Sequence, residues 1–251
     1  GMAASWQATD ALRLETSWER AYRIPEPYEI LGDGIYVDPN PALELEASSN
    51  INVGGRWERQ HEDRSLRLEA NAFLRSSSAF IRFNPLGPFG EYENLNNVRS
   101  EGVEASLQLE RGERLQATVN ATWQNLTDRT RRDEGLPNTN YRSRVPNVPW
   151  LFGNARLSLR PLSTQRGFAL HWGTRYVHEF FLTWENLGNP GDKNEIPRQL
   201  THDVQAEYAL QDGRYTVVLS IDNLTDAVAY DNFRIQKPGR ALSLQGRFFH
   251  H

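Results

Sequence analysis

Arginine and aromatic side chains gather in the segments of this chain that are rich in proline and glycine. Most lie in 128–149, others lie in 21–45, and one tryptophan directly precedes 185–197. A guanidinium group binds an anion through charge-assisted hydrogen bonds, and an aromatic ring adds stacking. The alternative for each residue is a solvated loop side chain, because exposed arginine is common. We predict binding of an anionic small molecule by Tyr22, Tyr28, Tyr36, Arg131, Arg132, Tyr141, Arg142, Arg144 and Trp184.

Catalytic and metal-binding patterns do not occur in the sequence. Cysteine is absent, and the 6 histidines form no HExxH motif and no cluster with metal-ligand spacing. A phosphate-binding GxxxxGK loop and a GxGxxG loop are also missing. The net charge of −4 gives no basis for general nucleic-acid binding. We therefore expect a binding protein that is not an enzyme, with no cofactor and no resident metal.

The elements that position these candidates are strands, because most of the chain alternates apolar and polar residues with a period of two. In 115–124, for example, Leu115, Val119 and Trp123 fall in one row and glutamine, threonine and asparagine in the other. Such alternation predicts a strand with one apolar and one polar face, whereas a helix would spread these residues around its surface. We expect about eleven strands, at 3–8, 11–20, 46–60, 65–83, 91–110, 114–127, 150–160, 168–184, 198–211, 214–223 and 239–249.

Short and long connections take turns between these strands. Short ones are expected at 9–10, 60–63, 111–113, 161–167 and 211–213, and long ones at 21–45, 84–90, 128–149, 185–197 and 224–237. In an antiparallel meander every second connection lies at the same end of the sheet. The pattern predicts an all-β, antiparallel, up-and-down transmembrane β-barrel, partial in extent, with short turns at one end and long loops at the other.

The two faces of these strands admit more than one interpretation. In a membrane barrel the polar face lines the lumen and the apolar face meets lipid, which suits the many alanines and glycines of the apolar rows. Several tryptophans share the parity of those rows, as in an aromatic girdle. The alternative is a soluble β-sandwich or small barrel that binds glycans, with the apolar face as its core. A third class, a barrel enzyme, would need a serine–histidine or paired-carboxylate site that the sequence does not identify.

Several stretches, in order along the chain, resemble TonB-dependent outer-membrane receptors. They are RLETSWERAYRIPEPYEILGDG (13–34), NPALELEASSNINVGGRW (40–57), YENLNNVRSEGVEASLQLE (92–110), RVPNVPW (144–150), and NLTD with AYDNF and PGRALSLQGRFF near the end. The resemblance implies a location in the outer membrane of a Gram-negative bacterium and energised uptake of a scarce nutrient such as a siderophore, cobalamin or an oligosaccharide. It implies as partners outer-membrane lipid, a small-molecule ligand such as a metal chelate, and an energising inner-membrane complex reached only through a plug domain.

The resemblance covers only part of the family's pattern, since full receptors have 22 strands and a plugged lumen. We expect residues 1–2 to be an artificial start and 3–251 to be a single β-barrel segment, the C-terminal part of a larger barrel without its plug. His250 stands where the family usually ends on an aromatic residue. Because bacterial barrels have even strand numbers, a second hypothesis is that the ten strands within 11–249 close into a small barrel of their own.

Overall fold

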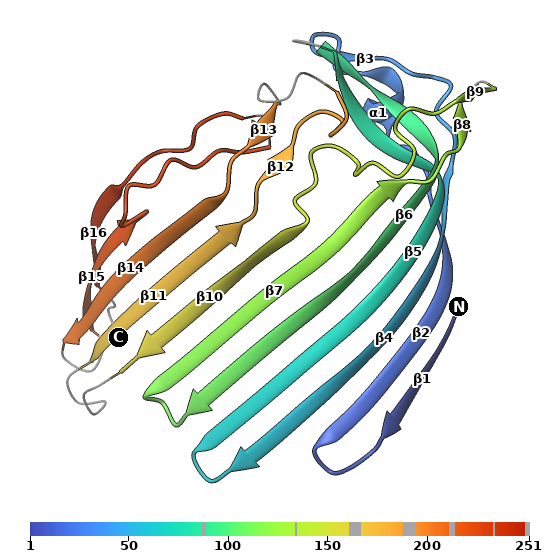
Figure 1. Ribbon diagram of the computed structural model, residues 1–251. Helices are drawn as coiled ribbons and strands as arrows, with labels where there is room; N and C mark the ends of the chain where they lie inside the picture. Colours follow the sequence, from blue (N-terminus) through green and yellow to red (C-terminus); the bar gives the residue numbers. More distant parts are fainter. Residues whose placement is uncertain are drawn as a thin grey trace.

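A computed structural model describes residues 1–86, 89–133, 135–160, 167–187, 194–210, 214–232 and 234–248. Its main feature is one curved sheet in which each long strand pairs antiparallel with the next one along the chain (Figure 1). The path runs through β1 (Met2–Gln7), β2 (Leu12–Arg23), β4 (Glu46–His61), β5 (Arg64–Leu86), β6 (Phe89–Arg111), β7 (Leu115–Asp128), β10 (Leu151–Leu159), β11 (Phe168–Val177), β14 (Gln199–Leu210), β15 (Tyr215–Asp222) and β16 (Ala241–Phe248). All the expected strands are therefore present.

Shorter elements lie at the loop end of the sheet (Figure 1). They are α1 (Pro27–Leu31), β3 (Val37–Asp38), which pairs parallel with β6, and the two-stranded pairs β8 (Arg132–Asp133) with β9 (Leu136–Pro137) and β12 (Phe180–Phe181) with β13 (Glu195–Ile196). No helix among the described residues is long and apolar enough to cross a bilayer.

Most element boundaries differ from the expectation by a few residues, as at β2, which runs to Arg23, and two differ more. The strand expected at 168–184 ends at Val177, because β12 leaves the sheet to pair with β13. The long loop expected at 84–90 is instead the tip of a hairpin, since β5 and β6 are 23 residues each and stay paired to Leu86 and Phe89. The turn expected at 211–213 and all but Gly167 of the turn at 161–167 lie outside the described residues, as does the His250 position.

The sheet is open rather than closed. Within the described residues β1 pairs only with β2, and β16 pairs only with β15. The hypothesis of a small barrel closed within 11–249 is therefore wrong, because β2 is paired on both sides and the edges are β1 and β16. The arc in Figure 1 curves too gently to bring these two edges together.

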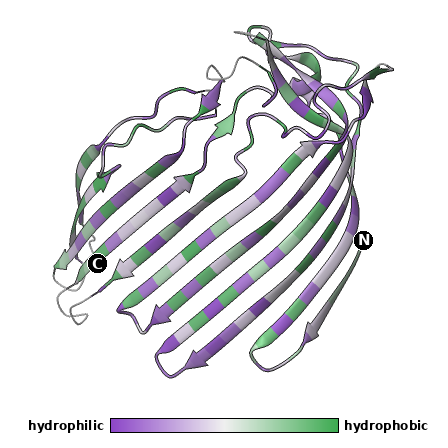
Figure 2. Ribbon diagram, in the orientation of Figure 1, coloured by the Kyte–Doolittle hydropathy of each residue, from purple (hydrophilic) through white to green (hydrophobic). Residues whose placement is uncertain are grey.

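Strand register places the apolar rows side by side on one face, which we call the outer face. Leu68 pairs with Leu107, and Leu107 with Val119. The described residues form no second layer over this face, and Leu68, Val119 and Leu219 remain 43%, 42% and 41% exposed. Figure 2 shows the resulting alternation of hydrophobic and hydrophilic positions along each strand. The β-sandwich alternative is wrong, because a sandwich would bury these side chains against a second sheet. The fold is a partial up-and-down β-barrel.

Candidate ligand-binding rim

The 128–149 loop is organised by one buried carboxylate. Asp128, at the end of β7, is only 2% exposed. Its Oδ1 accepts a hydrogen bond from the Thr130 amide at 2.7 Å, and its Oδ2 accepts one from Asn138 Nδ2 at 2.7 Å. The Asp128 main chain also accepts the Arg142 amide at 2.8 Å and donates to the Ser143 carbonyl at 3.0 Å. A single residue thus holds both ends of the loop tip in place.

Three predicted residues meet on this scaffold. The hydroxyl of Tyr141 accepts hydrogen bonds from the guanidinium groups of Arg131 and Arg142. These hydrogen bonds lower the pKa of Tyr141 below its usual value, and the hydrogen bond from Arg131 has the largest effect. The Arg142 guanidinium carbon also lies 5.3 Å from the centre of the Tyr141 ring. Arg131 and Arg142 are exposed, so two cations flank one ring at the surface. Such a group can bind negatively charged oxygen atoms while a flat ligand stacks on the ring.

Trp184 lies beneath the rim rather than on its surface. It is 8% exposed and packs with Val98 and Val145 in a small apolar cluster, against which Phe80, Leu95 and Leu126 also pack. The guanidinium of Arg82, which is paired with Glu93, lies 4.9 Å from the Trp184 ring. Because Val98 and Leu126 share strand parity with the polar rows, this cluster lies on the inner face at the loop end. The tryptophan therefore anchors the loop after β11 to the β5–β7 strands.

The contacts of the three tyrosines of the 21–45 segment are with residues other than Arg131, Tyr141 and Arg142. Tyr28, in α1, contacts Tyr92 of β6 through its hydroxyl and through an edge-on ring contact of 5.3 Å. Tyr36 and Tyr22 are 61% and 60% exposed. The backbone around Tyr36 is held by Asp33, whose carboxylate accepts amide hydrogen bonds from Val37, Ile35 and Tyr36, and these hydrogen bonds lower the pKa of Asp33.

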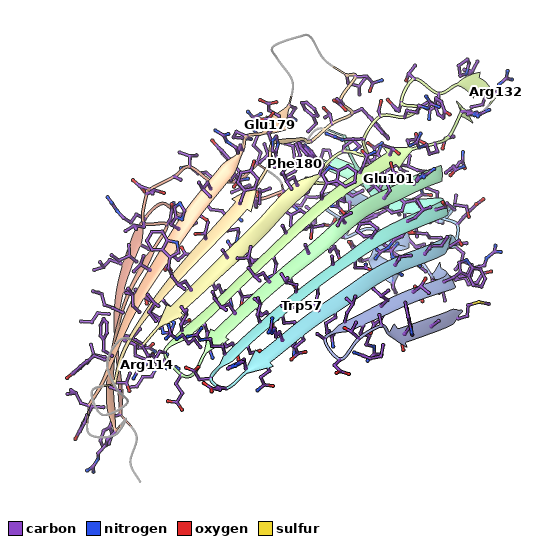
Figure 3. All side chains as sticks on the ribbon, turned by 60° about the horizontal axis from the view of Figure 1, so that its bottom comes forward. Trp57, Glu101, Arg114, Arg132, Glu179 and Phe180 are labelled. Carbon is purple, nitrogen blue, oxygen red and sulfur yellow. The ribbon has the colours of Figure 1, made fainter. Side chains whose placement is uncertain are left out.

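Arg144 and Arg132 are not among the described hydrogen-bond partners of Tyr141, which are Arg131 and Arg142. Arg144 forms a bridge with Thr127, donates to Asn125 Oδ1 at 3.3 Å and places its guanidinium 4.8 Å from the Trp150 ring centre. Because Thr127 and Asn125 share the parity of Val119 and Trp123, Arg144 lies on the outer face. Arg132 begins β8 and pairs with Pro137 of β9, and Figure 3 shows it at the loop end, far from Arg114 at the turn end.

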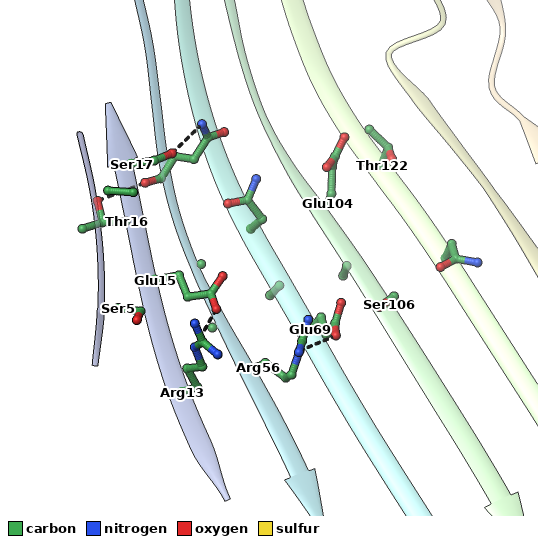
Figure 4. A pocket seen from close by; sticks show the side chains of 18 of the residues that line it. Ser5, Arg13, Glu15, Thr16, Ser17, Arg56, Glu69, Glu104, Ser106 and Thr122 are labelled. Atoms are coloured by element: carbon green, nitrogen blue, oxygen red, sulfur yellow. Dashed lines mark hydrogen bonds and ion pairs between the residues drawn. The ribbon is translucent and has the colours of Figure 1, made fainter. Parts of the chain in front are cut away.

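Below the rim, the inner face carries a hollow of about 650 Å³ lined by β1, β2, β4, β5, β6 and β7. Charged pairs lie along it, with Arg13 Nε 2.8 Å from Glu15 and Arg56 Nε 2.6 Å from Glu69 (Figure 4). Glu104 and Thr122 extend the polar lining to β6 and β7. A polar ligand or a polar protein segment can contact this wall without meeting an apolar barrier. In the part of the chain that the structure describes, no group of three or more histidine and acidic side chains could hold a metal ion.

The sequence did not identify Asp128, Tyr92 and Arg82 as parts of the rim. These buried or partly buried side chains hold its segments in place. The role of Asp128 could have been predicted from the sequence, because an aspartate two residues before a threonine at a strand end is typical of a side chain that caps a turn. Tyr92 and Arg82 lie within strands, and no local pattern marks them as partners of Tyr28 and Trp184.

The comparisons with known proteins agree with this geometry. The family model described as TonB dependent receptor-like, beta-barrel matches residues 2–224, which is most of the chain. The chain belongs to this family. TonB-dependent receptors are β-barrel proteins of the bacterial outer membrane, so the apolar outer face meets hydrocarbon and the polar inner face lines the barrel. The short turns then lie on the periplasmic side and the rim loops on the extracellular side.

Solved structures of TonB-dependent transporters and receptors share the fold. The copper transporter OprC superimposes with a TM-score of 0.74 at 13% identity, over 98% of this chain and 37% of the transporter. The ferric-catecholate import receptor Fiu from E. coli K12 gives 0.71 at 16% identity, over 97% and 34%. A mutant of the ferric enterobactin receptor PfeA from Pseudomonas aeruginosa gives 0.69 at 16%, over 97% and 39%. No curated protein sequence matches the chain. The chain thus spans little more than a third of the length of these structures.

Proposed function

We propose that this chain forms wall and rim of an outer-membrane receptor for energised uptake of a scarce nutrient. The candidate nutrients are a siderophore or other metal chelate, cobalamin and an oligosaccharide. The observation that carries the proposal is the group formed by Arg131, Tyr141 and Arg142 above a polar inner face. The similar structures of a copper transporter, a ferric-catecholate import receptor and a ferric enterobactin receptor support the metal-chelate class.

The chemistry of the group favours an anionic ligand among these candidates. Each guanidinium donates charge-assisted hydrogen bonds in a plane, which matches carboxylate, catecholate or phosphate oxygens. Asp128 and Trp184 keep the loop ordered before a ligand arrives, so less entropy is lost when the ligand binds.

The two open edges of the sheet support a proposal about the rest of the receptor. β1 and β16 each leave one side of a strand without a partner in the described residues, and such edges pair readily with further strands. We propose that residues 3–251 are the C-terminal part of a larger barrel, which these two edges complete. In this proposal a plug domain fills the lumen, contacts the polar wall and connects the receptor to the energising inner-membrane complex.

A binding and uptake assay tests the proposal on the intact protein. The probe is a ⁵⁵Fe-loaded tris-catecholate, with cyanocobalamin and a neutral oligosaccharide as further ligands, in cells in which this protein is the sole receptor. Loss of one hydrogen bond to a charged group costs about 1.5–3 kcal/mol, so R131Q/R142Q should weaken binding of an anionic ligand by at least about tenfold. The control R114Q, at the opposite end of the barrel, should bind as the parent does. Binding of none of the three ligands, or equal binding by both variants, would contradict the proposal.

A further inference from the structure

The outer face changes from apolar to polar side chains near the loop end of the strands. On β6 the outward row of Leu109, Leu107 and Val103 gives way to Glu101 and Arg99. On β7 the outward row passes Trp123 and continues with Asn125 and Thr127. Polar side chains therefore face the surroundings of the barrel just above the hydrocarbon level, where lipid headgroups lie.

Two arginines of this region lie on either side of one residue. Arg99 pairs with Thr127 across the β6–β7 ladder, and Arg144 forms a bridge with Thr127 from the other side. Paired residues point to the same face, and two strand spacings separate their backbones by about 10 Å. Two extended arginine side chains can therefore reach a single group placed between them. Close by, Arg129 follows β7, and its Nε is buried without a hydrogen-bond partner in the described residues.

A continuous chain of contacts holds these arginines in place. Arg99 is 3.0 Å from Glu101, and Asn125 donates to Glu101 at 3.5 Å. Asn125 in turn accepts from Arg144 at 3.3 Å. The side chains of Arg99 and Glu101 are 45% and 34% exposed, so the row is accessible from outside.

Aromatic rings continue the row toward β11. The Arg144 guanidinium lies 4.8 Å from the ring centre of Trp150, which lies 4.3 Å from that of His178. Tyr176 meets the other side of His178 at 6.1 Å. Tryptophan and tyrosine prefer the level of lipid headgroups, because one part of the ring is apolar and the other polar. We call Arg99, Glu101, Asn125, Arg144, Trp150 and His178 the border band.

We propose that the border band binds the phosphate of an outer-leaflet lipid headgroup, with Arg99 and Arg144 as the groups that contact it. Three arginines and one glutamate give this area an excess positive charge, although the whole chain has a net charge of −4. Guanidinium groups match phosphate oxygens bidentately. The apolar rows directly below, among them Val103 and Trp123, would contact the acyl chains of the same lipid. This site faces away from the lumen and does not depend on the proposed uptake.

Thermal unfolding of the intact protein in detergent tests the proposal. The probe is diphosphorylated lipid A, compared with the same lipid after enzymatic removal of its phosphates and with inorganic phosphate alone. Diphosphorylated lipid A should raise the Tm of the parent by several degrees, and R99Q/R144Q should lose at least half of that shift. The matched control R156Q/R175Q, two exposed arginines on the inner face, should keep the full shift.

A second measurement covers the case in which R99Q/R144Q folds poorly. Lipid phosphorus retained per protein after purification should fall for R144Q and be kept for R144K, because lysine retains the charge. Equal Tm shifts with dephosphorylated lipid, an equal shift in R99Q/R144Q, or a shift produced by inorganic phosphate alone would each overturn the assignment to a lipid phosphate.

Discussion

Replacing Trp184 by alanine should release one rim loop without unfolding the barrel. The ring is 8% exposed, packs on Val98 and Val145, and has Arg82 over its face. A tryptophan buries about 150–250 Å², which at about 25 cal/mol per Å² is worth about 4–6 kcal/mol. Residual contacts in the open loop reduce this by roughly 10–40%. We therefore expect a loss of about 3–5 kcal/mol in the free energy of opening the loop, in line with measured Trp→Ala costs.

Hydrogen exchange measures this loss directly, because amides of the loop are hydrogen-bonded in the closed state. Leu182 donates to the Asn194 carbonyl at 2.9 Å, and Leu187 donates to the Trp184 carbonyl at 3.0 Å. A loss of about 3 kcal/mol should speed exchange of these amides by about a hundredfold, while amides of β5 to β7 exchange as before. Trp172→Ala is the control, since that ring is 40% exposed on the outer face. Exchange in W184A that stays within about threefold of the parent would refute the anchoring role of Trp184.

Three further predictions concern the faces, the C-terminal turn and the rim. Leu107→Arg, on the outer face, should destabilise the protein by about 2–4 kcal/mol, whereas Ser106→Arg on the inner face should cost much less; the unfolding temperature from heat-modifiable gel migration compares them. Asp226→Ala should remove a 2.7 Å hydrogen bond from the Arg240 amide and cost about 1 kcal/mol, with Asp10→Ala as the exposed control in the same assay. Arg131→Gln should raise the pKa of Tyr141 toward its ordinary value, because the hydrogen bond that favours the phenolate is lost. In ultraviolet titration the parent should therefore ionise this tyrosine at lower pH than R131Q does, and identical curves would contradict the contact.

The strands could be predicted from the sequence because each lies between two environments of fixed polarity. A row such as Leu115 to Trp123 needs only its own alternation to be recognised, since neighbouring strands repeat the same pattern. Strand ends were less predictable. β11 ends at Val177 because Phe180 and Phe181 pair with Glu195 and Ile196, residues far along the chain.

The rim could be predicted by residue type but not by arrangement. Tyr141 and its two arginines lie within one loop, and their grouping follows from short-range geometry. Trp184 and Arg144 depend on partners elsewhere. Trp184 meets Val98 of β6, and the direction of Arg144 follows from its bridge to Thr127. Composition marks such residues as candidates for binding, whereas only the folded contacts distinguish an exposed side chain from an anchoring one.

The central claim is that, between positions 103 and 108 of β6, the odd-numbered residues face lipid and the even-numbered residues face the lumen. Because the chain contains no cysteine, single cysteines can be introduced at each position from 103 to 108 and spin-labelled in the intact protein. Power-saturation measurements in a bilayer should then show oxygen accessibility highest at 103, 105 and 107, and accessibility to a water-soluble nickel complex highest at 104, 106 and 108. The same accessibility at all six positions, or nickel accessibility highest at the odd ones, would contradict the account.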